Sequence, residues 1–244
     1  MNPTASRMSS AFQAMSTTSH CSRLSELSTC EISDALIKLG VPHGGLLPDI
    51  HIVAPSQETK VCAPACTVKM VMGSNTSAPK LSGHFVDQAP AGSVIVIDAP
   101  LEAKNAVWGG LMSAGAQARG AVGVVISGRC RDLAEHRALG FPVFARGHST
   151  LGQSPFTRPS EVNVPVYIKP VSNLTGSEDT FPAALVTPGD WVVGDEDGVV
   201  CVPRDMEEEV VVKALKGREV DDRCMQDIKA GRGVQASFKL HRGK

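Results

Sequence analysis

The sequence predicts an α/β fold in which a parallel sheet is connected through helices. Compact apolar runs at residues 93–98 and 122–127 have the composition of buried strands, and residues 141–145 are again strand-like. Helical segments separate these runs, at residues 110–119 and 132–139. Strands that alternate with helices in this way pair in parallel through right-handed crossovers.

The chain before this unit begins with a stretch of different composition. Residues 1–20 hold eight Ser or Thr, one Arg and no acid, so we expect residues 1–23 to be a disordered extension. A mitochondrial presequence is the alternative, although such peptides usually carry more Arg. The first helix is expected at residues 27–39, where Ser28 or Thr29 can cap it and Glu31 lies in its first turn.

Short strands and a long helix complete the expected domain, which spans residues 24–231. We expect strands at residues 61–72, 164–170 and 184–186, and a loop at residues 147–160. A β-hairpin is expected from residues 191–193 and 198–202, with a solvated acidic turn between them. The charged segment 206–228 has helical spacing, and residues 232–244 should be a mobile basic tail.

Composition excludes several classes of function. The net charge of −1 gives no basic field for nucleic acid or acidic membranes. No apolar run approaches the roughly 18 residues that span a bilayer. The seven cysteines are scattered without a CxxC pair, which is typical of reduced cysteines in a cytoplasmic protein.

Two features of residues 108–147 could carry chemistry. Gly109-Gly110 opens a helix, and the unpaired amides of a helix N-terminus can hold a carboxylate or phosphate. Arg131-Asp132 follows a buried strand, where functional groups of parallel sheets gather. The Arg can grip a carboxylate and the Asp can bind a hard cation. The alternative is a helix-capping Asp and a solvated Arg, and no nucleotide-binding glycine motif is present.

The same stretch resembles the signature of the RraA-like family. It has the Trp-Gly-Gly helix start, the Ala-Arg-Gly helix end, the Val-Gly-Val-Val-Ile strand, the Gly-x-x-Arg-Asp turn and the Leu-Gly-Phe-Pro-Val-Phe-Ala-Arg-Gly strand. The resemblance extends from near Leu24 to near Gly231. It implies a swivelling β/β/α fold, similar to phosphohistidine domains, with an added C-terminal helix. It also implies a homotrimer, or a hexamer built as a dimer of trimers.

The resemblance further implies a metal-dependent lyase. The aldolases and decarboxylases of this family cleave pyruvate-type 2-oxo acids through an enolate that Mg²⁺ or Mn²⁺ stabilises. Carried over, Asp132 is the metal ligand, Arg131 holds the substrate carboxylate, and the amides of Gly110, Leu111 and Met112 bind the same acid. An acid of the neighbouring subunit acts on metal-bound water. Glu219 matches it best, and Asp221 and Asp222 are the alternatives.

One position departs from the family pattern. Aldolases of this family often have an acid where this chain has Gly110, which puts efficient aldol cleavage in doubt. Decarboxylation of oxaloacetate demands less of the site. The distal half of the substrate is not specified by these motifs, so oxaloacetate, 4-hydroxy-4-methyl-2-oxoglutarate and 4-carboxy-4-hydroxy-2-oxoadipate all remain candidates.

Two alternative functions and several further residues complete the expectations. The bacterial regulators of the family bind and inhibit a ribonuclease, but they lack the extra C-terminal helix that this chain has. A menaquinone methyltransferase is disfavoured because no glycine-rich cofactor loop is visible. We expect His136 to be a surface histidine, and we leave roles in the site open for Asp98, His43 and His148.

Overall fold

The computed structural model describes residues 22–171 and 181–243. The expected extension therefore lies outside the described residues except for Ser22 and Arg23, where Ser22 caps a short 3-10 helix, η1, at Arg23–Glu26. The strands are β1 His51–Ala54, β2 Val61–Met72, β3 Val94–Asp98, β4 Ala106–Trp108, β5 Gly123–Cys130, β6 Val143–His148, β7 Thr157–Val162, β8 Val166–Ile168, β9 Ala184–Val186, β10 Trp191–Asp195 and β11 Gly198–Val202. The helices are α1 Thr29–Lys38, η2 Phe85–Gln88, α2 Gly110–Ala118, α3 Leu133–Leu139, η3 Arg204–Met206, α4 Glu207–Lys229 and α5 Val234–His241.

A nine-stranded mixed sheet forms the body. Seven of its strands follow the order β1-β6-β5-β3-β2-β10-β11, while β4 pairs with β5 and β7 pairs with β2. The predicted parallel unit is confirmed, because β3 pairs β5 and β5 pairs β6 in parallel. The sheet is nearly closed into a barrel. Residues 45–47 bond to β11, through Leu47 N–H to the Val199 carbonyl and Cys201 N–H to the Gly45 carbonyl, and β1 then pairs with β6.

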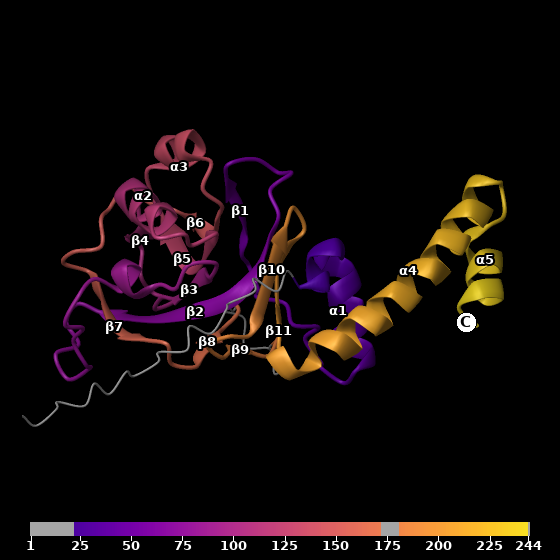
Figure 1. Ribbon diagram of the computed structural model, residues 1–244, viewed down its shortest axis with the longest axis horizontal. Coiled ribbons are helices and arrows are strands. Elements are labelled where there is room, and N and C mark those ends of the chain that lie inside the picture. The colour runs from indigo at the N-terminus through magenta and orange to yellow at the C-terminus, as the bar shows by residue number, and fades with distance from the viewer. Residues whose placement is uncertain (1–21, 172–180, 244) are drawn as a thin grey trace, which may run out of the picture.

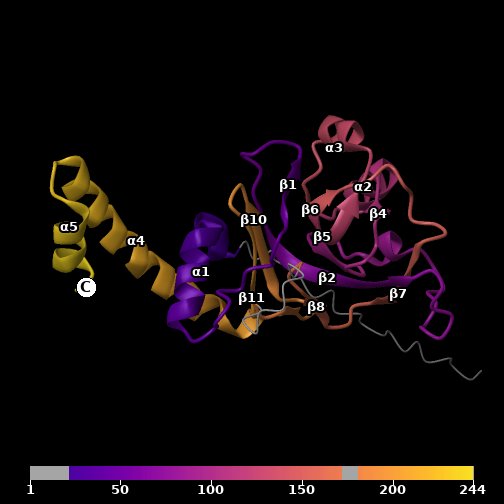
Figure 2. The ribbon, with the colours of Figure 1, turned by 180° about the vertical axis from the view of Figure 1, so that it is seen from behind.

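Both faces of the parallel strands are buried, which explains their continuous apolar sequence. In β3, Ile95 and Ile97 pack in the core under α2 and α3, whereas Val94 and Val96 face the interior of the barrel. Helices α2 and α3 thus lie on the outer face of β5 and β6, as Figure 1 and the reverse view in Figure 2 show.

A third core joins α1 and the start of α4 to β10 and β11. Of the two residues expected to cap α1, Ser28 is the cap, and it forms a complete capping box with Glu31. Asp195, which we expected in a solvated turn, instead accepts hydrogen bonds from the Thr29 N–H and hydroxyl at 2.8 and 2.7 Å. The β10–β11 hairpin is therefore confirmed, but its first acid anchors α1.

The C-terminal helices project from the body (Figure 1). Arg218 of α4 pairs with Glu31 of α1 at 2.5 and 2.7 Å, and beyond this pair α4 packs mainly on α5. The predicted mobile tail is thus a helix over most of its length. The Ser237 hydroxyl donates to the Cys224 carbonyl, and Asp227 pairs with both Arg232 and His241 at 2.9 Å. None of the described helices has both the length and the apolar character of a membrane span.

Candidate active site

Asp132 lies in the turn between β5 and α3. The strand β5, expected to end at residue 127, continues through Gly128 to Cys130, because β4 pairs along its end. The Arg131 N–H then donates to the Trp108 carbonyl at 3.0 Å. Asp132 follows with φ 62° and ψ 43°, the left-handed conformation that costs a non-glycine residue about 1–3 kcal/mol and clusters at functional sites.

This turn directs the Asp132 carboxylate at the first residue of α2. The Gly110 N–H donates to Asp132 Oδ2 at 3.0 Å, so the carboxylate lies on the positive end of the helix. A Cβ at Gly109 would lie 2.6 Å from the same oxygen, and a Cβ at Gly110 would lie 1.6 Å from Glu135 Oε2. The side chains of Asp132 and Glu135 therefore lie where a Cβ at either glycine would have to be placed.

Arg131 lies beside this carboxylate, with its Nε 3.6 Å from Asp132 Oδ2. A Cβ at Gly152 would lie 2.9 Å from Arg131 Nη1, so the loop after β6 backs the guanidinium closely. The two side chains remain 46% and 35% exposed, which leaves them open to a ligand. The expected pair is therefore joined in one site.

A pocket of about 320 Å³ opens over this pair. That volume lies within the range of small-molecule sites. It is lined by Arg131, Asp132, Leu133, His148, Ser149 and Thr150. Of the loop histidines, His148 thus lies at the site, whereas the His43 Nδ1 accepts a hydrogen bond from the Gly45 N–H at 3.1 Å.

The helix-start amides are not equivalent. The Gly110 N–H is bonded to Asp132, and the Met112 N–H donates to the Gly109 carbonyl at 3.0 Å. The Leu111 N–H has no acceptor within residues 22–171 and 181–243, and the Leu111 side chain is 81% exposed. Of the three expected amides, Leu111 is the one with a free donor.

His136 is fully buried, which corrects the expected surface histidine. The Trp108 Nε1–H donates to Ser113 Oγ at 2.8 Å, and that hydroxyl lies 2.9 Å from His136 Nδ1. The serine hydroxyl accepts from the indole, which can only donate, and its own proton is available to His136 Nδ1 in the neutral tautomer that leaves this nitrogen unprotonated. Burial lowers the pKa of His136, so this network is uncharged at neutral pH. It packs α2 against α3 beneath the site.

Asp98 lies outside the pocket of Arg131 and Asp132. It ends β3 on the side of the barrel interior, accepts a 3.2 Å hydrogen bond from the Ser127 hydroxyl, and lines a different pocket of about 200 Å³. Burial raises the pKa of this carboxyl.

The expected C-terminal acids are not brought to this site within one chain. Glu219 and Asp222 are exposed on α4, and Asp221 pairs with Arg242. The main contacts of α4 are with α1 and α5, and its free end points away from α2 and α3 in both views (Figures 1 and 2).

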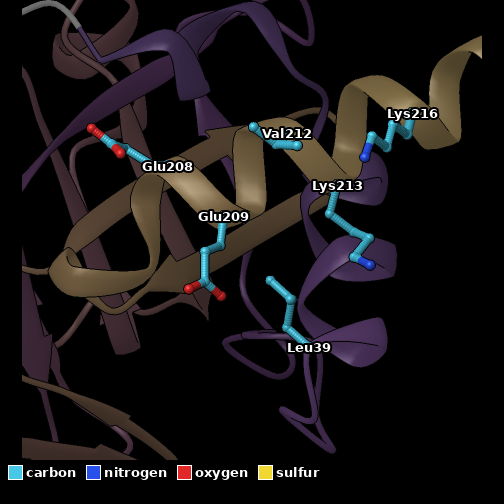
Figure 3. A pocket seen from close by; sticks show the side chains of 6 residues that line it. All are labelled: Leu39, Glu208, Glu209, Val212, Lys213 and Lys216. Atoms are coloured by element: carbon cyan, nitrogen blue, oxygen red, sulfur yellow. The ribbon is translucent and has the colours of Figure 1, made fainter.

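A separate groove of about 340 Å³ runs between α1 and α4. In Figure 3 the two glutamates lie toward one end and the two lysines toward the other. None of its lining residues belongs to the Arg131–Asp132 site; they are Leu39, Glu208, Glu209, Val212, Lys213 and Lys216.

A divalent cation fits the donors of the Asp132 site. No group of three or more His, Cys, Asp or Glu is arranged for a metal among the described residues, so Asp132 is not part of a closed cage. Mg²⁺ keeps several waters and is usually bound through one or two carboxylates, and Mn²⁺ shares this preference for oxygen. Gly109 and Gly110 carry no side chain that would overlap the Asp132 and Glu135 oxygens, so these oxygens can lie at the start of α2.

Comparisons with known proteins identify relatives of the chain in sequence and in fold. Residues 29–201 match the family RraA-like: Aldolase/RraA. A protein of Halalkalibacterium halodurans named "Putative 4-hydroxy-4-methyl-2-oxoglutarate aldolase" is 34% identical over 81% of this chain and 82% of its own length. The structure of an uncharacterized protein from Pseudomonas syringae pv. tomato has a TM-score of 0.70 at 30% identity, over 88% of this chain and 94% of that one.

A third likeness concerns the fold alone. Streptomyces coelicolor RraAS2, described as an unusual member of the RNase ES inhibitor RraA protein family, has a TM-score of 0.67 at 24% identity, over 82% of this chain and 92% of that one. The fold class expected from the sequence is confirmed by these structures and by the family match. The match of residues 29–201 to the family and the identity with the Halalkalibacterium halodurans protein lead to one conclusion: the chain belongs to the RraA-like family.

Proposed function

We propose that this chain is a divalent-metal-dependent carbon–carbon lyase acting on pyruvate-type 2-oxo acids, by oxaloacetate decarboxylation, by retro-aldol cleavage of 4-hydroxy-2-oxo acids, or by both. One observation carries the proposal: the Asp132 carboxylate is held on the Gly110 amide in a left-handed turn, beside the Arg131 guanidinium. The name of the Halalkalibacterium halodurans relative supports the aldolase class.

Each residue has a definable role in such a reaction. Asp132 would hold the cation through oxygen, and the bound cation would act as a Lewis acid toward the 2-oxo group. Arg131 binds the substrate carboxylate through its planar pair of N–H donors. The free Leu111 N–H, at the positive end of α2, is available to an oxygen that gains negative charge as the C3–C4 bond breaks.

The proposal includes a shared site in a homotrimer or a dimer of trimers. The C-terminal acid of the site would come from α4 of a neighbouring subunit. Helix α4 projects from the rest of its chain (Figure 1), and its Val212 and Met225 side chains are half exposed, which leaves them available for contact with that subunit. Glu219 is the best candidate for that acid. It is exposed and makes no hydrogen bond or ion pair within the described residues, whereas Asp221 is already paired with Arg242 and Asp222 lies in the field of Arg218.

Pyruvate release from three acids tests the function. Oxaloacetate, 4-hydroxy-4-methyl-2-oxoglutarate and 4-carboxy-4-hydroxy-2-oxoadipate are each incubated with the protein and Mg²⁺ or Mn²⁺, and the rate with metal alone is subtracted. We expect enzyme-dependent pyruvate from at least one acid, abolished by EDTA. Release from oxaloacetate alone would assign a decarboxylase. No release from any acid would contradict the enzyme and favour the regulator reading.

A further inference from the structure

Glu135 has a position that helix capping does not explain. It is the third residue of α3, the place where Glu31 in α1 closes a capping box with Ser28. Glu135 makes no such bond, and Asp132 provides no side-chain cap. Within the described residues its carboxylate has no hydrogen-bond donor and no cation in ion-pair range.

The Glu135 carboxylate instead lies over the first residue of α2. A Cβ on Gly110 would lie 1.6 Å from Glu135 Oε2, 2.6 Å from its Cδ and 2.8 Å from its Cβ. This side chain therefore fills the volume that a side chain at position 110 would take. The same glycine donates its N–H to Asp132 Oδ2, so two carboxylates from α3 and its preceding turn converge on one residue.

Asp132 and Glu135 both have an oxygen beside Gly110, and within the described residues no cation lies in ion-pair range of Glu135. Arg131 offsets Asp132 only in part, because its Nε is 3.6 Å away and the guanidinium is half exposed. The arrangement suits a hard divalent cation, which binds carboxylate oxygens and retains part of its water shell.

We propose that Glu135 is the second acidic group of the divalent-cation site, supplying from α3 the negative charge that Gly110 cannot. This inference rests on the proposed function, because it places the cation at Asp132. It accounts for Gly110 in physical terms: the glycine is required by the neighbouring carboxylate and does not mark a lost acidic group. Glu135 thereby acts with Asp132 in holding the cation and its waters.

Mn²⁺ binding to the metal-free protein, measured by isothermal titration calorimetry, tests the assignment without relying on activity. We expect Glu135→Gln to weaken Mn²⁺ binding about tenfold, as for other groups that orient a metal's immediate ligands. Gly110→Ala should give a similar loss, because its methyl group displaces the carboxylate of Glu135. Glu196→Gln, at an exposed turn, is the matched control and should bind as wild type does.

Moving the carboxylate from position 135 to position 110 makes the test specific. Glu135→Ala combined with Gly110→Asp returns a carboxylate to the same volume, and it should bind Mn²⁺ more tightly than Glu135→Ala alone. Thermal melting checks that every variant is folded. Wild-type affinity in Glu135→Gln, while Asp132→Asn loses binding, would overturn the role of Glu135 and leave the proposed function standing. No Mn²⁺ binding by the wild-type protein would overturn both.

Discussion

The Gly110 amide and the Asp132 carboxylate join the start of α2 to the turn before α3 through a 3.0 Å hydrogen bond. The bond holds a charged oxygen at the positive end of a helix, and it offsets part of the strain of the left-handed Asp132 backbone. Arg131 and the Leu111 amide are arranged around this bond, so its geometry controls the rest of the site.

Arg131→Lys is expected to lower kcat/KM for pyruvate release by at least about tenfold. A lysine ammonium keeps the charge but cannot reproduce the planar pair of donors, and losing a hydrogen bond to a charged group costs about 1.5–3 kcal/mol. Arg137→Lys on the exposed side of α3 is the matched control. Steady-state kinetics on the preferred acid make the comparison, and unchanged kinetics in Arg131→Lys would remove this residue from the carboxylate site.

Ser113→Ala is expected to destabilise the fold by about 1–3 kcal/mol for each group left without a partner, namely the Trp108 indole N–H and His136 Nδ1. Adding His136→Leu should recover part of the loss, because one of those groups is then removed. Urea unfolding at pH 7 measures the difference, with Ser82→Ala as an exposed control. A neutral effect of Ser113→Ala would show that the network contributes no stability.

The burial of His136 beside Ser113 makes the free energy of unfolding depend on pH, and the direction of the pKa shift fixes the sign. Burial lowers the pKa of His136 in the folded protein, so the unfolded chain takes up a proton first as the pH falls below about 6.5. The stability associated with His136 is therefore present above that pH and is lost below it. The double variant Ser113→Ala/His136→Leu should lose less stability than wild type between about pH 6.5 and 5. Equal losses would contradict a buried neutral histidine.

Glu31→Gln is expected to lower the stability by about 1–2 kcal/mol at pH 7, after allowance for solvent screening of the partly exposed pair. The hydrogen bonds from Arg218 lower the pKa of Glu31 from 4.5 to about 2. A depressed carboxyl pKa stabilises the fold above the unfolded value, and this contribution is lost as the pH falls from about 4.5 toward 2. Urea unfolding of both proteins should therefore differ at pH 7 and converge toward pH 3. If the difference in free energy of unfolding stayed the same at every pH, the Glu31–Arg218 ion pair could not be its source.

Mixing two inactive variants tests the shared site. Asp132→Ala and Glu219→Gln should each lack activity, and subunit exchange between them should restore some, because a fraction of interfaces would combine intact Asp132 with intact Glu219. Mass spectrometry confirms that mixed oligomers have formed. No recovered activity in such mixtures, or a catalytically active monomer in light scattering, would contradict a site built from two chains.

Much of the fold could be predicted because its signals are local. The buried runs of β3 and β5 and the capping box of Ser28 and Glu31 are each contained in a few residues. The strand β7 was missed, since Pro159 and charged residues hide it and only pairing with the end of β2 creates it. The helix α5 was missed because its sequence is basic and its stability comes from contacts with α4 such as Asp227 with His241.

The candidate site likewise has some features with a local sequence signal and others that depend on tertiary contacts. Arg131, Asp132 and the glycine pair are adjacent to recognisable strand and helix ends, so the sequence predicted their meeting. The burial of His136 has a signal in the sequence, because this residue lies three residues from both Leu133 and Leu139, on the apolar stripe of α3. The contact between Glu135 and Gly110 had no sequence signal, because it depends on how α3 crosses the start of α2.

Asp132→Asn gives the most direct test of the metal-dependent site. Asparagine adopts the left-handed conformation readily, so the variant should keep the fold, as thermal melting can verify. Pyruvate release from the preferred acid is measured for wild type and variant with Mn²⁺ and with EDTA, with the rate of metal alone subtracted. We expect wild type to require Mn²⁺ and Asp132→Asn to fall to the background. Wild-type rates in Asp132→Asn, or full wild-type activity in EDTA, would contradict the assignment.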